Sequence, residues 1–439
     1  MHGRKYVAVG SVALTVVALA ALAGEWNVFH PIRGRGGRPR PPLHAISPSP
    51  VPPAPQDANA ADEQLAAMWF DNNGKKVNVR VADVKAALAA GASVNVDVNN
   101  AGTPLMAAAE TGNLACVKYL VSKGAKVVYK GGSETTPLMY AVKSGSLPCV
   151  KYLISAGATV RERGDAGMTP LLYAAQCGFT DCVKYLVAAG ANVNDRDMLK
   201  ITPLMYAGAS GNAPCVTYMV GRGARIIDGD WHKTTPLMYA AKGGSLEALR
   251  FLVDRGARIN DHDKALCTPL MYASVSGVPS CVAYLLARGA RVNVRDDYGA
   301  TALMAALSRG PADPWEPSEQ NGNKANGILD QEVDGTQPAA HALRCARLLV
   351  QHGAKINVTD EYGSCPIGLA AETGNETSLK YLVHHGANVS AMDRTGDTVL
   401  MKAAESCSAS CVRLLLIRGA DPNVVGHVEG VTALMHAAM

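Results

Sequence analysis

Cysteine and histidine are the residues of this chain whose chemistry would be easiest to recognise, and neither occurs in a catalytic or metal-binding pattern. The 439 residues include eleven cysteines but no CxxC pair, so the usual spacing of a zinc or redox site is missing. The histidines are scattered, apart from the adjacent His384 and His385. The sequence also lacks HExxH, a Walker-type phosphate loop, GxSxG and the Rossmann glycine fingerprint. We therefore predict no catalytic residues, no metal ligands and no cofactor, in a protein that is not an enzyme.

Seven of the cysteines recur at one position of a repeated pattern. An odd number of cysteines spread along a long chain does not indicate a disulfide framework. Neighbouring copies of this position should lie roughly 8–10 Å apart, beyond the roughly 7 Å Cα limit for a disulfide. We expect these side chains to be small, buried and apolar. They are Cys116, Cys149, Cys182, Cys215, Cys281, Cys345 and Cys411.

The repeated pattern begins with Thr-Pro-Leu-Met or a close variant. Its starts are separated by 33 residues from Thr103 to Thr301, then by 64, 33 and 34 residues. A fixed period of this length is typical of a stack of supersecondary units. The starts are Thr103, Thr136, Thr169, Thr202, Thr235, Thr268, Thr301, Cys365, Thr398 and Thr432.

Each repeat predicts two short helices and a loop. The threonine can cap a helix, and the proline suits the first helical position. A glycine such as Gly112 ends this first helix. A second apolar run, such as the one from Cys116, ends at a Gly-Ala pair, where glycine suits a left-handed C-cap. Polar, turn-rich residues then lead to the next threonine and can form a protruding hairpin.

Two short helices cannot bury their apolar faces alone, but stacked neighbours can. The predicted fold class is therefore an all-α repeat solenoid of stacked helix-turn-helix units with protruding hairpin loops. The Thr-Pro-Leu start, the Gly-Ala end, the Asn-rich loop and the period resemble ankyrin repeats over residues 62–439, with nine full units. The usual His of Thr-Pro-Leu-His is Met in eight units. We expect this change to lose a local polar contact and soften the turn, without altering the fold.

The resemblance implies that proteins bind to the hairpin tips and to the inner face of the first helices. The matching inner positions are mostly small and polar, which predicts a shallow groove whose candidate contacts are Lys143, Gln176 and Lys242. A tyrosine follows the methionine position in five units, and we expect it to pack between repeats rather than bind a ligand. The candidate contacts on the tips include Tyr129, Arg163, Lys200 and Tyr298.

Trp231, His232 and Lys233 form the strongest candidate, on the hairpin before Thr235. Residues there should be solvated, and an exposed tryptophan beside a cation is typical of an interface hot spot. The alternative is that Trp231 folds onto the neighbouring hairpin. The sequence predicts partner binding at this tip without excluding that alternative.

Residues 1–24 form a hydrophobic N-terminal segment. Residues 6–24 carry no charge and are rich in Val, Ala and Leu. This uncharged stretch is just long enough to span a bilayer. The segment also fits a secretory signal cleaved after Ala23, and a buried soluble helix is the third interpretation. The arginines that follow favour repeats on the cytosolic side of a membrane.

Three further stretches interrupt or bound the repeats. Residues 25–61 are a Pro-rich linker, with nine prolines between positions 31 and 60. An insertion near residues 310–340 is polar and carries Trp315, and it is either a surface loop or a partner-docking segment. Beyond Thr432 the chain has one apolar helix without a polar outer face, which suggests a truncated chain or an end that needs a partner.

The net charge and its distribution along the chain also bear on the predicted function. The net charge is +5, and six of the basic residues precede position 61, so the repeats are close to neutral. This balance argues against a general nucleic-acid surface. We predict a non-catalytic protein–protein interaction scaffold or adaptor without a small-molecule substrate, tethered by a single membrane pass, with its repeats in the cytosol. The partner is another protein, of unknown identity.

Two alternatives to this prediction stay open. One is a secreted or lumenal binding protein, for which the sequons at Asn357, Asn375 and Asn388 would matter. The other is an N-terminal fragment of a larger ankyrin-repeat enzyme.

Overall fold

The computed structural model describes residues 56–69, 76–77, 79–97, 102–132, 134–308, 338–427 and 430–438. The hydrophobic segment at residues 1–24, most of the Pro-rich linker and most of the insertion lie outside these ranges. Among the helices that are described, none has the length and apolarity needed to cross a bilayer. The described residues form two compact units, an N-terminal unit up to Asn192 and a C-terminal unit from Val193.

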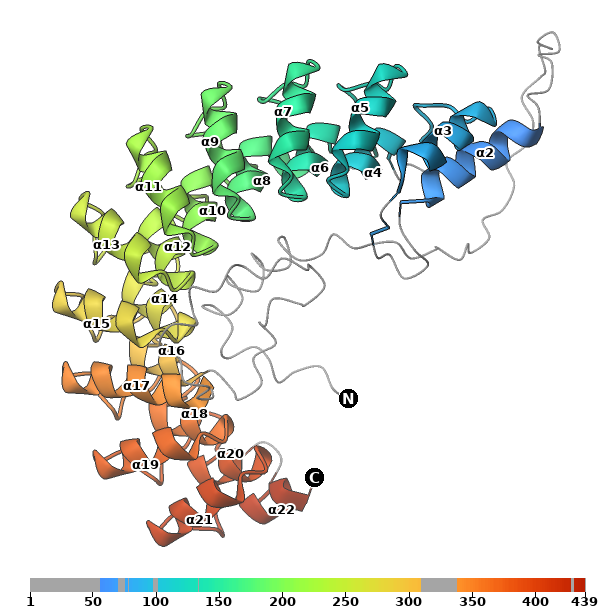
Figure 1. Ribbon diagram of the computed structural model, residues 1–439. Helices are drawn as coiled ribbons and strands as arrows, with labels where there is room; N and C mark the ends of the chain where they lie inside the picture. The colour runs from blue at the N-terminus through green and yellow to red at the C-terminus, as the bar shows by residue number, and fades with distance from the viewer. Residues whose placement is uncertain are drawn as a thin grey trace, which may run out of the picture. The chain divides into compact units, whose positions relative to one another are not determined.

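The N-terminal unit consists of paired helices (Figure 1). Its first element begins at Gln56, so the linker boundary expected at residue 61 falls inside a helix. The Ala-rich composition of this stretch favours a helix, and Leu65 and Trp69 are fully buried. The elements are α2 (Gln56–Ala67), α3 (Val81–Ala89), α4 (Pro104–Glu110), α5 (Leu114–Ser122), α6 (Pro137–Lys143), α7 (Leu147–Ser155), the 3-10 turn η2 (Asp165–Gly167), α8 (Pro170–Gln176) and α9 (Thr180–Ala188).

The C-terminal unit repeats the same helix pair. First and second helices form two separate rows within this unit (Figure 1). The first helices are α10 (Pro203–Ala209), α12 (Pro236–Lys242), α14 (Pro269–Ser276), α16 (Ala302–Leu307), α18 (Pro366–Glu372), α20 (Val399–Glu405) and α22 (Ala433–Ala438). The second helices are α11 (Ala213–Gly221), α13 (Leu246–Asp254), α15 (Pro279–Ala287), α17 (Pro338–Gln351), α19 (Glu376–His384) and α21 (Ala409–Ile417).

The insertion joins the two helices of one repeat, as its position in the pattern predicts. It leaves the chain after α16 and returns at α17, so residues 338–340 of the predicted insertion belong to a helix. That helix has 14 residues, whereas α15 and α19 on either side have nine each. The insertion therefore extends a second helix at its start without interrupting the rows.

Each first helix begins as the Thr-Pro start predicts. In α10 the Thr202 hydroxyl accepts a hydrogen bond from the amide of Met205 at 3.3 Å, and Pro203 takes the first helical position. Gly211 follows the helix with a φ of 69°, and Gly223 follows α11 with a φ of 87°. Both values lie in the left-handed region that glycine adopts without strain, so each helix stops where a glycine allows it to.

The methionine of the start motif makes a contact that we did not expect. The backbone amide of Thr202 lies 3.4 Å from the Met205 sulfur, and the same contact occurs at Met238 and Met271. The expectation that replacing histidine would lose a local polar contact is therefore wrong in these repeats. A thioether is a weak acceptor, but it lies close enough to satisfy the threonine amide.

The core of each unit lies where its two helix rows meet. Leu204, Met205 and Ala207 of α10 and Val216 of α11 are at most 1% exposed. The seven cysteines of the shared repeat position are buried there, and none of the eleven cysteines forms a disulfide. Burial raises the pKa of the Cys281 thiol to about 12. The prediction that these cysteines act as small apolar core residues is confirmed.

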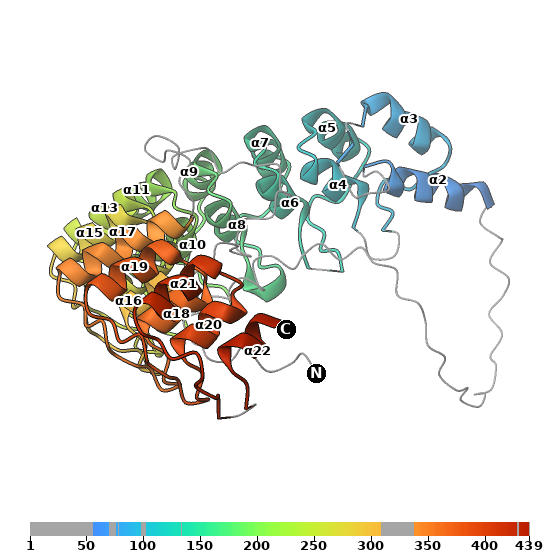
Figure 2. The same cartoon turned by 90° about the horizontal axis from the view of Figure 1, so that it is seen from below.

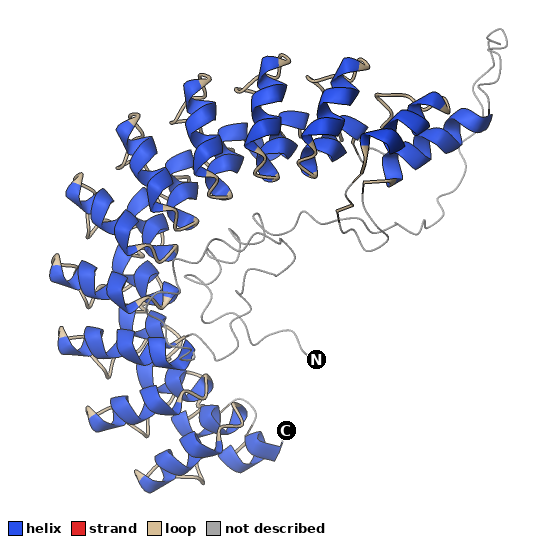
Figure 3. Ribbon diagram, in the orientation of Figure 1, coloured by secondary structure: helices blue, strands red, loops and turns tan. Residues whose placement is uncertain are grey.

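The loops before the first helices leave the helical layers on one side. In the C-terminal unit they project together, as Figure 2 shows. Among the described residues they are turns and irregular backbone rather than strands, with an isolated bridge between Met392 and Thr398 (Figure 3). Stacked helix pairs with projecting loops confirm the predicted all-α repeat solenoid.

Candidate protein-binding surface

The projecting loops of the C-terminal unit are joined at their tips by backbone hydrogen bonds. One amide in each loop donates to a carbonyl of the preceding loop, as from Trp231 to Leu199 and from Lys264 to His232, both at 2.8 Å. We call this series the tip ladder. Because neighbouring tips are bonded directly, their side chains are held in a fixed order. The ladder donors are Trp231, Lys264, Asp297, Glu361, Arg394 and His427, at 2.8–3.1 Å.

A buried or half-buried aspartate bonds the backbone of each tip in the C-terminal unit. One carboxylate oxygen of Asp230 accepts from the amides of His232 and Thr234, both at 2.8 Å, and the other accepts from the Tyr239 hydroxyl at 2.9 Å. Tyr206 and Tyr272 donate in the same way to Asp197 and Asp263, at 2.8 and 2.7 Å. Three of the five tyrosines that we expected to pack between repeats therefore also anchor the loops.

Burial controls the ionisation of these aspartate–tyrosine pairs. It raises the pKa of Asp197 and Asp263, although the tyrosine hydroxyls and backbone amides oppose the rise. Burial also raises the pKa of Tyr239 and Tyr272, and the neighbouring carboxylates raise it further. The tyrosines therefore stay protonated and remain hydrogen-bond donors, while the carboxylates point inward instead of facing solvent.

Trp231 is exposed on the tip ladder. Its side chain is 54% exposed. The Lys200 amine from the preceding tip lies 5.1 Å from the ring centre, and the Lys264 amine from the following tip lies 5.3 Å from it. Both distances are within the range of a cation–π interaction. The tryptophan therefore packs against neighbouring loops and still presents much of its surface to solvent, which combines the two outcomes that the sequence left open.

The other predicted residues of this tip are also exposed. His232 and Lys233 are solvent-facing, and Lys233 and Lys200 have φ values of 63° and 62°. A positive φ is uncommon for a residue with a side chain and marks a tight turn. The structure thus brings Trp231, His232, Lys233 and Lys200 together on adjacent tips.

The remaining tip candidates lie elsewhere. Tyr298 belongs to the tip ladder but stacks on Tyr362, with ring centres 6.0 Å apart. In the N-terminal unit, the Tyr129 hydroxyl donates to Asp97 at 3.0 Å, and the exposed Arg163 donates to the carbonyl of Gly167 at 3.1 Å. The tyrosine contacts join neighbouring loops, and the Arg163 contact lies within one loop, so the three do not gather into one site.

The inner-face candidates are half-buried on the first helices. The Lys143 amine lies 5.6 Å from the Tyr140 ring centre and 5.7 Å from that of Tyr173. Gln176 ends α8, and Lys242 ends α12, where burial lowers the pKa of its amine to about 8. Of the three, Lys242 lies in the C-terminal unit, in the repeat that carries Trp231.

Sequence reasoning missed three residues near Trp231. Met198 is 73% exposed and Leu266 is 41% exposed, and the exposed Lys264 packs on the tryptophan ring. A signal was present, because Met198, Trp231 and Lys264 occupy the same position of the 33-residue pattern. Comparing that position along the chain would have found the patch.

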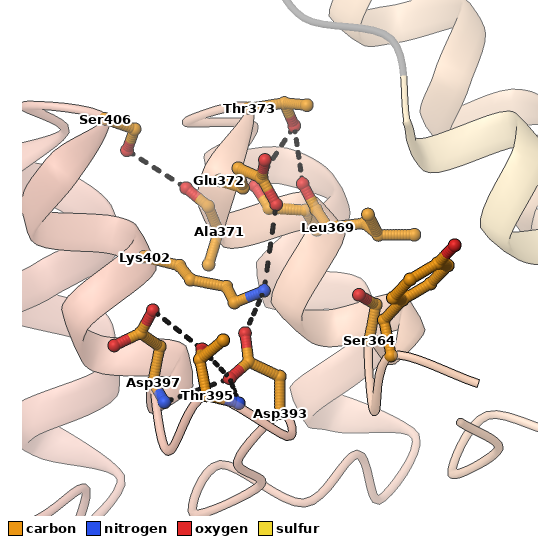
Figure 4. Close-up of polar contacts among 12 residues, drawn as sticks. Ser364, Leu369, Ala371, Glu372, Thr373, Asp393, Thr395, Asp397, Lys402 and Ser406 are labelled. Atoms are coloured by element: carbon orange, nitrogen blue, oxygen red, sulfur yellow. Dashed lines mark hydrogen bonds and ion pairs between the residues drawn. The ribbon is translucent and has the colours of Figure 1, made fainter. Parts of the chain in front are cut away.

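A second polar cluster lies farther along the C-terminal unit. Lys402 of α20 takes the repeat position that tyrosine holds in α10, α12 and α14. Its amine lies 2.8 Å from the Asp393 carboxylate and 3.8 Å from that of Glu372 (Figure 4). Burial would lower the pKa of Lys402, but the hydrogen bond to Asp393 raises it above the usual value. Here an ion pair replaces the tyrosine–aspartate hydrogen bond.

The arrangement offers a protein-binding surface of exposed tips on a rigid helical support. The described residues contain no group of three or more His, Cys, Asp or Glu side chains placed to hold a metal ion. Comparison with known proteins agrees with this class of fold. A family model of ankyrin repeats matches residues 51–131, 127–197, 196–263, 261–313 and 336–426. The chain therefore belongs to the ankyrin repeat family, and its repeats form a protein–protein interaction domain.

Two further comparisons add little to this assignment. Among solved structures, the human ASB11 ankyrin repeat domain is similar at 27% sequence identity, with a TM-score of 0.43. The match covers 50% of this chain and 95% of that one. A search of curated proteins finds no match.

Proposed function

We propose that this protein is a non-catalytic scaffold that binds another protein through the tip ladder of its C-terminal unit. The observation that carries the proposal is the exposed Trp231 on a ladder that holds neighbouring tips together by backbone hydrogen bonds. A large aromatic side chain held in place before binding loses little conformational entropy on contact. Tryptophan is also among the residue types enriched at interface hot spots.

Replacing Trp231 tests the proposal. We expect Trp231→Ala to weaken binding by more than about 1 kcal/mol, because truncation removes the aromatic contact area. The partner is first identified by photo-crosslinking from the exposed neighbouring position 232, and its affinity is then measured by calorimetry. Lys355→Ala, at an exposed residue outside the tip ladder, is the control. An unchanged affinity of a correctly folded Trp231→Ala chain would contradict the proposal.

We also propose that residues 1–24 tether the protein to a membrane and that the repeats face the cytosol. The support comes from the sequence, where an uncharged stretch is followed by arginines. Protease treatment of intact membranes carrying a C-terminally tagged chain tests this topology. The proposal is supported if the tagged chain sediments with the membranes and the protease then removes the tag. A protected tag places the repeats in the lumen, and a tag that leaves the membrane favours cleavage after Ala23.

The sequons provide a second indicator of topology. The Asn375 side chain is buried and bonded to the amide of Ser378 and the carbonyl of Ala339, at 3.0 and 3.3 Å. A glycan there would require this contact to open. Asn388 is exposed. A lumenal chain should therefore carry sugar at Asn388 in preference to Asn375, which glycosidase treatment and mass spectrometry would show.

A further inference from the structure

We propose that the tips carrying Lys200, Trp231, Lys233 and Lys264 bind an acidic protein segment with a large apolar side chain. We call these four residues, together with Met198 and Leu266, the basic tip patch. The inference rests on the proposed function and adds the chemistry of the partner. Charge complementarity and exposed apolar surface on the same three tips carry it.

The outward-facing charge of the patch is positive. Lys200, Lys233 and Lys264 are all exposed. Each of the three loops contains two aspartates. The one nearer the tip is buried and held by a tyrosine hydroxyl (Asp197, Asp230 and Asp263), whereas Asp195 and Asp261 are half-buried and lie before the tip in sequence. The nearby Asp228 is bonded to Arg196 and also lies 3.6 Å from Arg225. A binding segment therefore meets three cations at the tips, and carboxylates on that segment would complement them.

The same tips expose apolar surface. Met198 and Trp231 occupy equivalent positions of adjacent loops and are 73% and 54% exposed, and Leu266 is 41% exposed. Because the tips are bonded to one another, this surface is already formed before binding. It can accept a large apolar side chain between the lysines, which supplies an attraction that charge alone does not give.

The tips after Lys264 carry acidic residues, which limit how far the binding site extends along the tip ladder. The ladder position held by Trp231 and Lys264 becomes Asp297 and then Glu361, both exposed. An acidic segment would be repelled there. We therefore expect it to lie across the tips from Met198 to Leu266 and not to continue along the ladder.

A single-stranded nucleic acid is the main competing ligand, because it also combines negative charge with stacking groups. Two lysine amines already lie over the Trp231 ring, which leaves less ring face for a base to stack on. The exposed Met198 and Leu266 beside the ring can still contact a flexible apolar side chain, which favours a protein segment.

Selection from a displayed library of random linear peptides tests the inference with the full chain. We expect wild type to enrich peptides in which Asp or Glu flanks a large apolar residue. Fluorescein-labelled versions of these peptides should bind more weakly as salt rises. Trp231→Ala should lower the affinity for these peptides by about tenfold or more, and the double variant Lys200→Glu/Lys264→Glu should abolish binding. Lys355→Glu, an exposed lysine in another repeat, should bind as wild type.

Folding is checked by thermal melting of every variant, and labelled oligo(dT) serves as the competing probe. Enrichment of neutral or basic peptides, unchanged affinity of the Lys200→Glu/Lys264→Glu chain, or Trp231-dependent binding of oligo(dT) would overturn the inference. If a crosslinked partner still depends on Trp231 while acidic peptides do not bind, the partner chemistry is wrong and the scaffold function stands. If no protein ligand depends on Trp231, the proposed function itself fails.

Discussion

At the scale of single residues, the aspartate of each loop has a tyrosine partner in three successive repeats and other partners farther along the C-terminal unit. Asp230 accepts from Tyr239, and Asp393 pairs with Lys402. Asp296 accepts from the amides of Tyr298 and Ala300, at 3.0 and 2.8 Å. The position that carries tyrosine or lysine elsewhere is Ala305 in that repeat, and its methyl group cannot donate a hydrogen bond.

This difference predicts a pH effect on stability at Asp296. Burial raises the pKa of Asp296 from an ordinary 3.8 to about 6, so the folded state binds the proton more tightly than the unfolded state. The resulting stabilisation is fully present below the unfolded pKa and is lost as the pH rises through about 6. Asp296→Asn should remove up to ~3 kcal/mol of this pH dependence.

The measurement is the free energy of unfolding in urea at about pH 4 and about pH 7, for wild type and variant. The readout is how much the change in unfolding free energy between the two pH values differs between wild type and variant, because other groups titrate in both proteins. Asp181→Asn, which removes an exposed carboxylate that does not act on Asp296, is the control. Equal pH dependence in wild type and Asp296→Asn would contradict the prediction.

Lys402 gives a second prediction at this scale. Lys402→Ala should destabilise the protein by about 2 kcal/mol, because it leaves Asp393 without its charged hydrogen-bond donor. Lys402→Tyr should cost less, since a tyrosine there can donate to Asp393 as its equivalents do in other repeats. Urea unfolding of the two variants compares them. If Lys402→Tyr were as destabilising as Lys402→Ala, the two kinds of donor would not be interchangeable.

At the scale of elements, an asparagine four residues after the Gly-Ala glycine ties successive repeats together. The Asn260 side chain donates to the carbonyl of Gly289 at 3.1 Å and accepts from the amide of Arg291 at 2.8 Å. Asn194 makes the same pair of bonds to Gly223 and Arg225, both at 3.0 Å. One side chain thus satisfies two backbone groups of the next repeat.

Ile227 interrupts this series. It holds the asparagine position between Asn194 and Asn260, and its side chain is 60% exposed. Ile227→Asn should stabilise the C-terminal unit by about 1 kcal/mol, because it can bond the carbonyl of Gly256 and the amide of Arg258. Urea midpoints measure the change. Ile227→Ala, which offers no amide, should give no such gain, and Asn260→Ile should be destabilising.

At the scale of the whole molecule, stability in each unit comes from contacts between neighbouring repeats. Such a stack behaves nearly as a one-dimensional chain, in which a local defect affects mainly the adjacent repeats. Leu252 of α13 is fully buried. Leu252→Ala should cost 2–5 kcal/mol, because it leaves a cavity between helix rows.

Hydrogen exchange shows how far the Leu252→Ala defect spreads. Protection should fall most in the helices around α13 and less toward α20 and α21. A uniform loss of protection across the C-terminal unit would show instead that this unit unfolds as one block. The exposed Lys355→Glu chain is a control that leaves the core unchanged.

The candidate site was only partly predictable from the sequence. Trp231, His232, Lys233 and Lys200 were recognised, because polar loop positions are solvated in any repeat of this kind. Lys264, Met198 and Leu266 were missed, because their importance depends on how adjacent loops lie against each other. The thioether contact of Met205 was missed for a different reason, since it is local and depends on the side-chain conformation of the methionine.

The sequence by itself determined the repeated helix pairs and their stacking, although it placed the starts of α2 and α17 a few residues too late. Threonine caps, prolines and left-handed glycines act within a few residues, and the regular period carries the apolar face of each pair onto the next. The tertiary structure alone decided which side chains meet between loops. Hydrogen bonds from Trp231 to Leu199 and from Lys264 to His232 join residues about one repeat apart, so the basic tip patch exists only once the repeats have stacked.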